Sequence, residues 1–180
     1  RFASDLGCPK VDTTDSGRVY DIPREDVLKQ SIRNYQECLK WAEDYETIIN
    51  IEPHGPYTGD IDFMKKLFKH FESEYLRFNM DTGNTFIQGN DPPEFLKALR
   101  KYVTHVHIKD VSPSLAAAIH GEGTGIATSE VGIGEGVNAE NIKKCLEYLK
   151  ETNWDGDISI ECSGTDDKIE YSVNFLRGII

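Results

Sequence analysis

The chain alternates two hydrophobic periods five times, and this alternation restricts its fold more than any other feature. Short apolar runs of strand length are each followed by a longer stretch in which apolar residues recur every three or four positions. The predicted strands span residues 10–14, 47–52, 76–81, 103–109 and 157–161. The predicted helices span residues 24–44, 62–73, 92–102, 139–149 and 167–178. Five strand-helix units in series predict an α/β fold built on a parallel sheet.

Residue types that start and end helices accompany this pattern. Asp91 stands directly before Pro92, which is typical of an N-cap followed by the first helical residue. Asn138 stands in the equivalent place before the helix at 139–149 and is predicted to cap it. The first seven residues resemble the last turn of a helix that Gly7 terminates.

A closed barrel of strand-helix units has eight strands, whereas this chain supplies five. We therefore expect residues 1–180 to form a single domain, the last five βα units of a TIM (β/α)8 barrel. Residues 111–138 are too many for an ordinary connection after the fourth strand. They are predicted to form an insertion or lid within the domain.

Four of the predicted strands end in a residue that binds metals. Glu52, Asp81 and Glu161 are carboxylates, and the remaining strand carries His107 with His105 two positions before it. The carboxyl ends of parallel strands meet at one face of a barrel or sheet, so these side chains should converge. Either histidine can serve as the ligand, because residues two apart share a strand face. Carboxylates with one imidazole suit Mn²⁺, Mg²⁺, Co²⁺ or Zn²⁺ without selecting sharply among them.

Composition and charge argue against several other classes of protein. The 31 acidic residues outnumber the 20 basic ones, and a net charge of −11 repels nucleic acid. No apolar run approaches the roughly 20 residues that cross a bilayer, and no secretory signal is visible. The four cysteines show no C-x-x-C pairing, so neither a disulfide framework nor a zinc knuckle is indicated. We expect a cytoplasmic protein that binds neither nucleic acid nor membranes.

Five short motifs carry a resemblance to a known family. In chain order they read NIEPHG, NMDTGN, HVHIKD, IGEGVN and ISIECSG. This series resembles the later part of the xylose-isomerase-like TIM barrel superfamily, the sugar phosphate isomerases and epimerases. The resemblance implies one divalent ion, most often manganese, and it selects His107 over His105. The implied metal ligands are Glu52, Asp81, His107 and Glu161.

The resemblance also implies an activity. It predicts a sugar or keto-sugar isomerase or epimerase that works through proton transfer and a metal-stabilised enediolate. Glu52 and Glu161 would move protons as well as bind the metal. The candidate residues for substrate binding are His54, Asn84, His105 and Lys109.

Two departures loosen the link to the 3-epimerases of this superfamily. Those enzymes typically have a histidine three residues after the aspartate and an arginine six after the ligand histidine. Asn84 and Pro113 stand at these positions. The order His107, Lys109, Asp110 looks more like inosose dehydratases, and SPSLAAA looks similar to barrel subunits of C-glycoside deglycosidases. A metal-dependent lyase acting on 3-keto sugars or glycosides is therefore the alternative.

Two further readings complete the alternatives. Apurinic-site endonucleases have a related barrel but need additional metal ligands, and this acidic chain offers few. A non-catalytic metal-binding or assembly subunit is also compatible with the sequence. The expected partner is a small-molecule sugar or keto-sugar, with assembly into a homo-oligomer or with a partner subunit left open.

Overall fold

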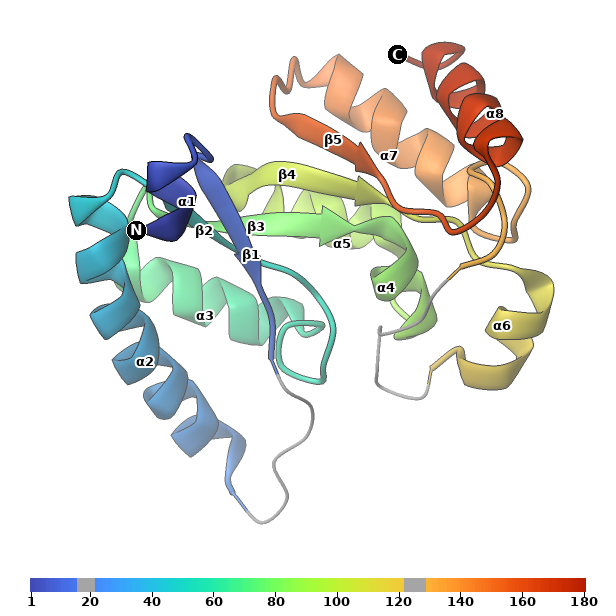
Figure 1. Ribbon diagram of the computed structural model, residues 1–180. Helices are drawn as coiled ribbons and strands as arrows, with labels where there is room; N and C mark the ends of the chain where they lie inside the picture. Colours follow the sequence, from blue (N-terminus) through green and yellow to red (C-terminus); the bar gives the residue numbers. More distant parts are fainter. Residues whose placement is uncertain (16–21, 122–128) are drawn as a thin grey trace.

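Five parallel strands form one curved sheet in the computed structural model, which describes residues 1–15, 22–121 and 129–180. The strands are β1 (Lys10–Thr13), β2 (Ile48–Ile51), β3 (Leu76–Asp81), β4 (Val103–Ile108) and β5 (Asp157–Ile160). They pair in chain order, so every connection leads to the neighbouring strand (Figure 1). The sheet forms a half-barrel whose strands all point the same way.

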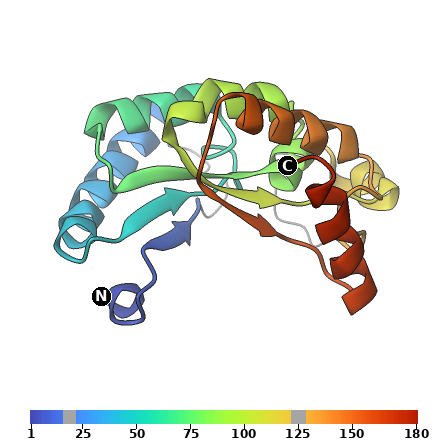
Figure 2. The ribbon, with the colours of Figure 1, turned by 90° about the horizontal axis from the view of Figure 1, so that it is seen from above.

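Helices cover the outer, convex side of the sheet. The long helices are α2 (Arg24–Asp44), α3 (Ile61–Phe71), α5 (Pro92–Leu99), α7 (Ala139–Glu151) and α8 (Asp166–Arg177). Figure 2 shows the strands as an arc, with α2, α3, α5 and α7 along its outer side and α8 beside β5. The predicted alternation of five strands and five helices is therefore confirmed, with ends that shift by up to three residues.

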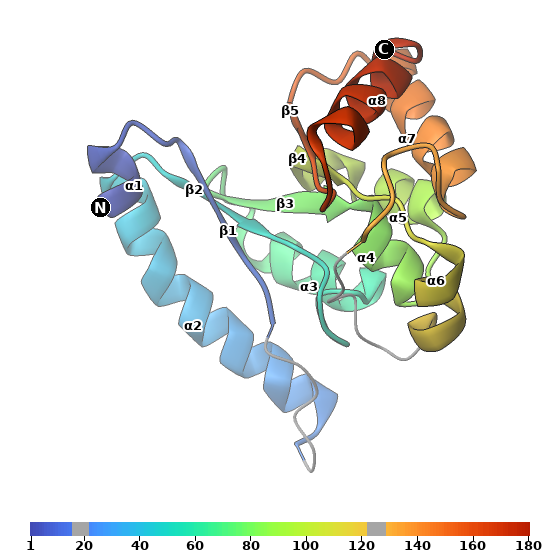
Figure 3. The ribbon, with the colours of Figure 1, turned by 45° about the vertical axis from the view of Figure 1, so that its right-hand side comes forward.

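Short helices complete the structure at several connections. They are α1 (Phe2–Asp5), α4 (Thr82–Ile87), α6 (Pro113–Ile119) and the 3₁₀ helix η1 (Arg100–Tyr102). The sequence pattern predicted neither α4 nor α6. Both lie beyond the carboxyl ends of β3 and β4 (Figure 3). The amide of Gly121 donates to Ile87, and the rings of His120 and Phe86 are 4.7 Å apart, which joins these two regions.

The hydrophobic core lies between the sheet and the outer helices. Phe78 of β3 is fully buried and contacts Phe68 of α3 edge to face, with ring centroids 6.2 Å apart. It also contacts Phe95 of α5 at 5.9 Å. Aromatic pairs in such geometries add to the free energy gained by burying their apolar area. These contacts fix the outer helices, and the opposite face of the sheet is left for polar residues.

The inner, concave face of the sheet is polar. Lys10 of β1 reaches Asp157 of β5 across this face, with 2.5 Å between ammonium and carboxylate. An ion pair between the first and last strands requires strong curvature, as in a barrel wall. The pairing of β3 with β4 also shifts register between Phe78 and Asn79, which brings Asn79 opposite His105.

Among the residues that the structure describes, none of the helices has the length and apolar character that a membrane span requires.

Candidate metal centre

Four side chains from four strands meet at the carboxyl end of the half-barrel. Asp81 is the last residue of β3, His107 lies near the end of β4, and Glu52 and Glu161 directly follow β2 and β5. One ligand atom from each lies within 4.8 Å of all the others. His107 Nδ1 is 3.4 Å from a Glu52 oxygen, 3.9 Å from Asp81 Oδ2 and 3.6 Å from Glu161 Oε2. We call these four residues the candidate metal site.

The distances between the polar atoms of this site agree better with shared ligation of a cation than with direct hydrogen bonds. Separations of 3.4–3.9 Å exceed ordinary hydrogen-bond lengths. Ligands about 2.1 Å from a metal ion lie roughly 3.0–3.4 Å from their neighbours, close to these gaps. Asp81 Oδ2 and His107 Nδ1 are buried and have no hydrogen-bond partner. A buried carboxylate oxygen without a hydrogen bond is costly, and a bound divalent cation would satisfy it.

In the metal-free site, bound protons supply the positive charge that a metal ion would bring. Burial raises the pKa of Asp81 to about 8. Burial lowers the pKa of His107, but contacts with Glu161 and Glu52 outweigh this and raise it to about 10. Burial opposes ionisation of Glu52 and Glu161, yet contacts with His107 lower both pKa values, that of Glu161 to about 2. The two glutamates are therefore ionised at neutral pH, whereas Asp81 and His107 are protonated.

Lys109 and Asn84 border the candidate metal site and are both buried. Lys109 Nζ lies 2.8 Å from Asn84 Oδ1, 3.0 Å from Glu161 Oε2 and 3.4 Å from Asp81 Oδ2. The Asn84 amide in turn donates to Glu52 at 3.0 Å. The two predicted substrate-binding residues thus link the carboxylates. Their contact with a substrate stays a prediction.

His54 also reaches Glu52, with 3.1 Å between Nε2 and the carboxylate oxygen. The hydrogen bond to Glu52 raises the pKa of His54. Its loop is held by Asp15, whose carboxylate accepts N–H groups of Gly55, Tyr57 and Thr58 at 2.7–3.2 Å. Sequence reasoning missed Asp15, because a single aspartate after a strand gives no sign of this long-range contact.

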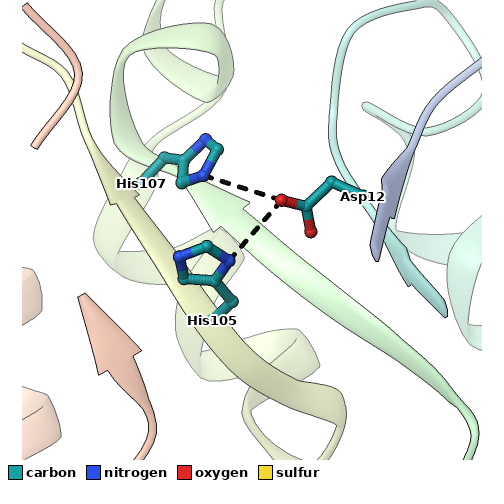
Figure 4. Close-up of side chains that lie close together, drawn as sticks. All are labelled: Asp12, His105 and His107. Atoms are coloured by element: carbon teal, nitrogen blue, oxygen red, sulfur yellow. Dashed lines mark ion pairs between the residues drawn. The ribbon is translucent and has the colours of Figure 1, made fainter. Parts of the chain in front are cut away.

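His105 lies one layer deeper on the inner face than the candidate metal site. Its Nε2 pairs with Ser159 Oγ at 2.8 Å, and its Nδ1 lies 3.6 Å from Asp12 (Figure 4). Asp12 was also missed from the sequence. Asp12 lies two residues after Lys10 on β1, so the two side chains share one face of the sheet. This spacing was the available signal that Asp12 belongs to the inner face.

Asp110 anchors the far end of the predicted insertion. Its carboxylate accepts the N–H groups of Gly134, Gly136 and Asn138 at 2.8–3.0 Å. Asn138 is the N-cap residue of α7, as predicted, but its side chain makes no capping hydrogen bond, and its amide donates instead to the carbonyl oxygens of Thr82 and Lys109. Residues 122–128 lie outside the described residues, so the lid function stays a prediction.

Comparison with known proteins identifies the family. A sequence model described as a xylose isomerase-like TIM barrel matches residues 1–179. The chain belongs to the xylose isomerase-like TIM barrel family. The predicted fold, a TIM barrel represented by five βα units, is confirmed by the half-barrel and this match. An uncharacterized protein of Methanocaldococcus jannaschii is 28% identical over 152 residues, which cover 81% of this chain and 47% of the relative.

Several solved structures superpose on nearly the whole chain. A xylose isomerase domain protein from Planctomyces limnophilus has a TM-score of 0.78 at 22% identity, over 99% of this chain and 62% of that one. A D-tagatose 3-epimerase-like protein has a TM-score of 0.77 at 23% identity, over 98% of this chain and 65% of that one. The IOLI protein with a bound zinc atom has a TM-score of 0.76 at 19% identity, over 99% of this chain and 66% of that one. At such identities the likeness shows the fold, and the chain spans less than two thirds of each structure.

Proposed function

We propose that this protein is a divalent-metal-dependent isomerase or epimerase of a sugar or keto-sugar. The observation that carries the proposal is the position of Glu52 and Glu161, which approach the same nitrogen of His107 from different strands. Proton transfer beside a carbonyl needs a base next to the group that stabilises the developing negative charge. The candidate metal site combines both requirements.

The donor set fits a divalent ion and does not choose among manganese, magnesium, cobalt and zinc; we propose manganese first. Glu52, Asp81, His107 and Glu161 would hold it. The ion would polarise a carbonyl and an adjacent hydroxyl of the substrate and thereby acidify the intervening C–H bond. Family membership supports this proposal, as do the zinc in the IOLI structure and the description of another similar structure as epimerase-like.

The two glutamates differ in access and therefore in role. The Glu161 side chain is 47% exposed, whereas that of Glu52 is 11% exposed and is held by His54 and Asn84. We therefore assign to Glu161, which is the more accessible of the two and is ionised at neutral pH, the removal of a proton from a substrate carbon. An isomerase returns that proton to the neighbouring carbon, whereas an epimerase needs a donor on the other face of the substrate, a role that we assign to Glu52 with His54 beside it.

The proposal is tested by solvent exchange with Glu161→Gln. Metal-loaded protein is incubated in D₂O with a panel of ketoses and keto-sugars, and deuterium at carbon is measured by NMR. Because Glu161 is also a proposed ligand, both proteins are compared at a metal concentration that saturates each. The variant should then lose about 10²–10⁴-fold in exchange rate, which is the usual contribution of a general base. Glu170→Gln, an exposed change on α8, is the matched control and should keep the full rate. Near-normal exchange in metal-bound Glu161→Gln would exclude the assigned role.

A lyase acting on 3-keto sugars or glycosides is the second candidate, and Lys109 favours it. Its buried ammonium lies 3.0 Å from Glu161, so acid and base stand side by side. Elimination needs such an acid to protonate the leaving oxygen after the base removes a proton. Mass spectrometry separates the two functions, because isomerisation keeps the mass of the substrate, whereas elimination releases water or an aglycone.

A further inference from the structure

A second group of metal-binding side chains lies beneath the candidate metal site on the inner face of the sheet. Asp12 projects from β1 toward His105 and His107, which are neighbours on β4 (Figure 4). Asp12 Oδ2 is 3.6 Å from His105 Nδ1 and 3.8 Å from His107 Nε2. The ligand atoms of all three residues lie within 4.8 Å of one another.

The geometry points to a second divalent-cation site formed by Asp12, His105 and His107. The two gaps to Asp12 are too long for hydrogen bonds, but they are close to the separation of ligands around one ion. Two imidazoles and one carboxylate are a common protein donor set for Zn²⁺, Fe²⁺ and related ions. This site goes beyond the proposed function and rests on it only through His107.

The orientation of each ring agrees with a ligand role. Ser159 holds Nε2 of His105 at 2.8 Å, so Nδ1 is directed toward Asp12. Metal-binding histidines are usually oriented in this way, by a hydrogen bond to the other ring nitrogen. His107 directs Nδ1 toward the candidate metal site and Nε2 toward Asp12, so it has one nitrogen for each ion.

Asn79 supplies an independent sign of an unfilled polar site. It is fully buried, and both its amide oxygen and its amide nitrogen lack hydrogen-bond partners. It lies two residues before Asp81 and therefore on the same inner face, opposite His105 in the pairing of β3 with β4. A buried amide without partners is costly, and an ion with its bound water beside His105 would give it one.

The local charge also accommodates a second cation. The surrounding ionisable groups include the carboxylates of Asp12, Glu52, Asp81 and Glu161 and the ammonium of Lys109. The nearby ion pair of Lys10 with Asp157 adds no net charge. When the carboxylates are ionised, a single divalent ion still leaves this cluster negative. Because each nitrogen of His107 would give a lone pair to one ion, the ring must release its remaining N–H proton to solvent when both sites fill.

Titration of the metal-stripped protein with Co²⁺ alone tests the inference, because the visible absorption of bound Co²⁺ reports each filled site. The wild type should bind two equivalents and release a proton with the second. Asp12→Asn, isosteric and at an exposed residue, should bind one, and so should His105→Asn. Asp155→Asn is the matched control: it makes the same change at an exposed residue between α7 and β5, outside the site, and should keep two equivalents.

The possible results separate this inference from the proposed function. A wild type that saturates at one equivalent overturns the second site, as do two equivalents retained in both variants. A wild type that binds no Co²⁺ overturns both the second site and the proposed function.

Discussion

Replacing Asp81 by asparagine should separate metal binding from folding. Burial raises the pKa of Asp81 to about 8, so at pH 7 only about one tenth of the metal-free protein carries this carboxylate ionised. Asparagine then replaces a neutral acid by a neutral amide of the same shape. Its oxygen can still accept the N–H group of Asn84, which Asp81 Oδ1 accepts at 2.6 Å. We expect Asp81→Asn to cost less than about 1 kcal/mol of metal-free stability.

The same change should abolish most of the stabilisation by metal. An ion present at one hundred times its dissociation constant stabilises the folded state by about 2.7 kcal/mol. For a chain of this length, that corresponds to about 5–10 °C in Tm. Because an amide oxygen is a much weaker ligand than a carboxylate, we expect this shift in the wild type and little of it in Asp81→Asn.

Thermal unfolding in EDTA and in excess Mn²⁺ measures both quantities. Asp91→Asn is the matched control, since Asp91 caps α5 through the N–H group of Glu94 at 2.9 Å and lies outside the site. It should keep the full metal shift. A loss above about 3 kcal/mol for Asp81→Asn in EDTA would refute the argument that burial keeps Asp81 protonated. An undiminished metal shift would refute its role as a ligand.

Three further predictions follow from close packing, proton occupancy and a buried carboxylate. A β-carbon at Gly83 would lie 2.5–2.7 Å from the Lys109 side chain, so Gly83→Ala should cost about 1–3 kcal/mol in urea unfolding; a cost under about 0.5 kcal/mol would contradict this packing. The raised pKa values of Asp81 and His107 mean that Mn²⁺ must displace protons, so the affinity for Mn²⁺ should rise between pH 6 and pH 8, by up to about tenfold per pH unit for each proton. A Mn²⁺ affinity that does not change with pH, measured in competition with a chelator, would refute this. Asp110→Asn should cost at least about 2 kcal/mol of folding stability and speed hydrogen exchange of the backbone amides at residues 134–138, because the new NH₂ group faces N–H donors or leaves one of them without an acceptor. Unchanged hydrogen exchange, measured by mass spectrometry, would argue against this anchor.

The sequence pattern alone predicted the architecture and the three carboxylates of the candidate metal site. Both depend on local information: hydrophobic period distinguishes strands from helices, and a parallel arrangement brings every strand end to one edge. The Asp91 cap before Pro92 was predictable for the same reason, and its carboxylate accepts the N–H group of Glu94. The short helices α4 and α6 were not predictable from period, because six and seven residues are too few to show one clearly.

Only the tertiary structure decided which side chains meet across the inner face. Curvature brings Asp12 of β1 to His105 and His107 of β4, and a register shift between β3 and β4 aligns Asn79 with His105. The strand pattern left open which histidine lies at the strand-end site, and the family resemblance selected His107. The structure places His107 there and His105 one layer deeper. Such contacts depend on register and curvature summed over several strands, and no local pattern in the chain records either quantity.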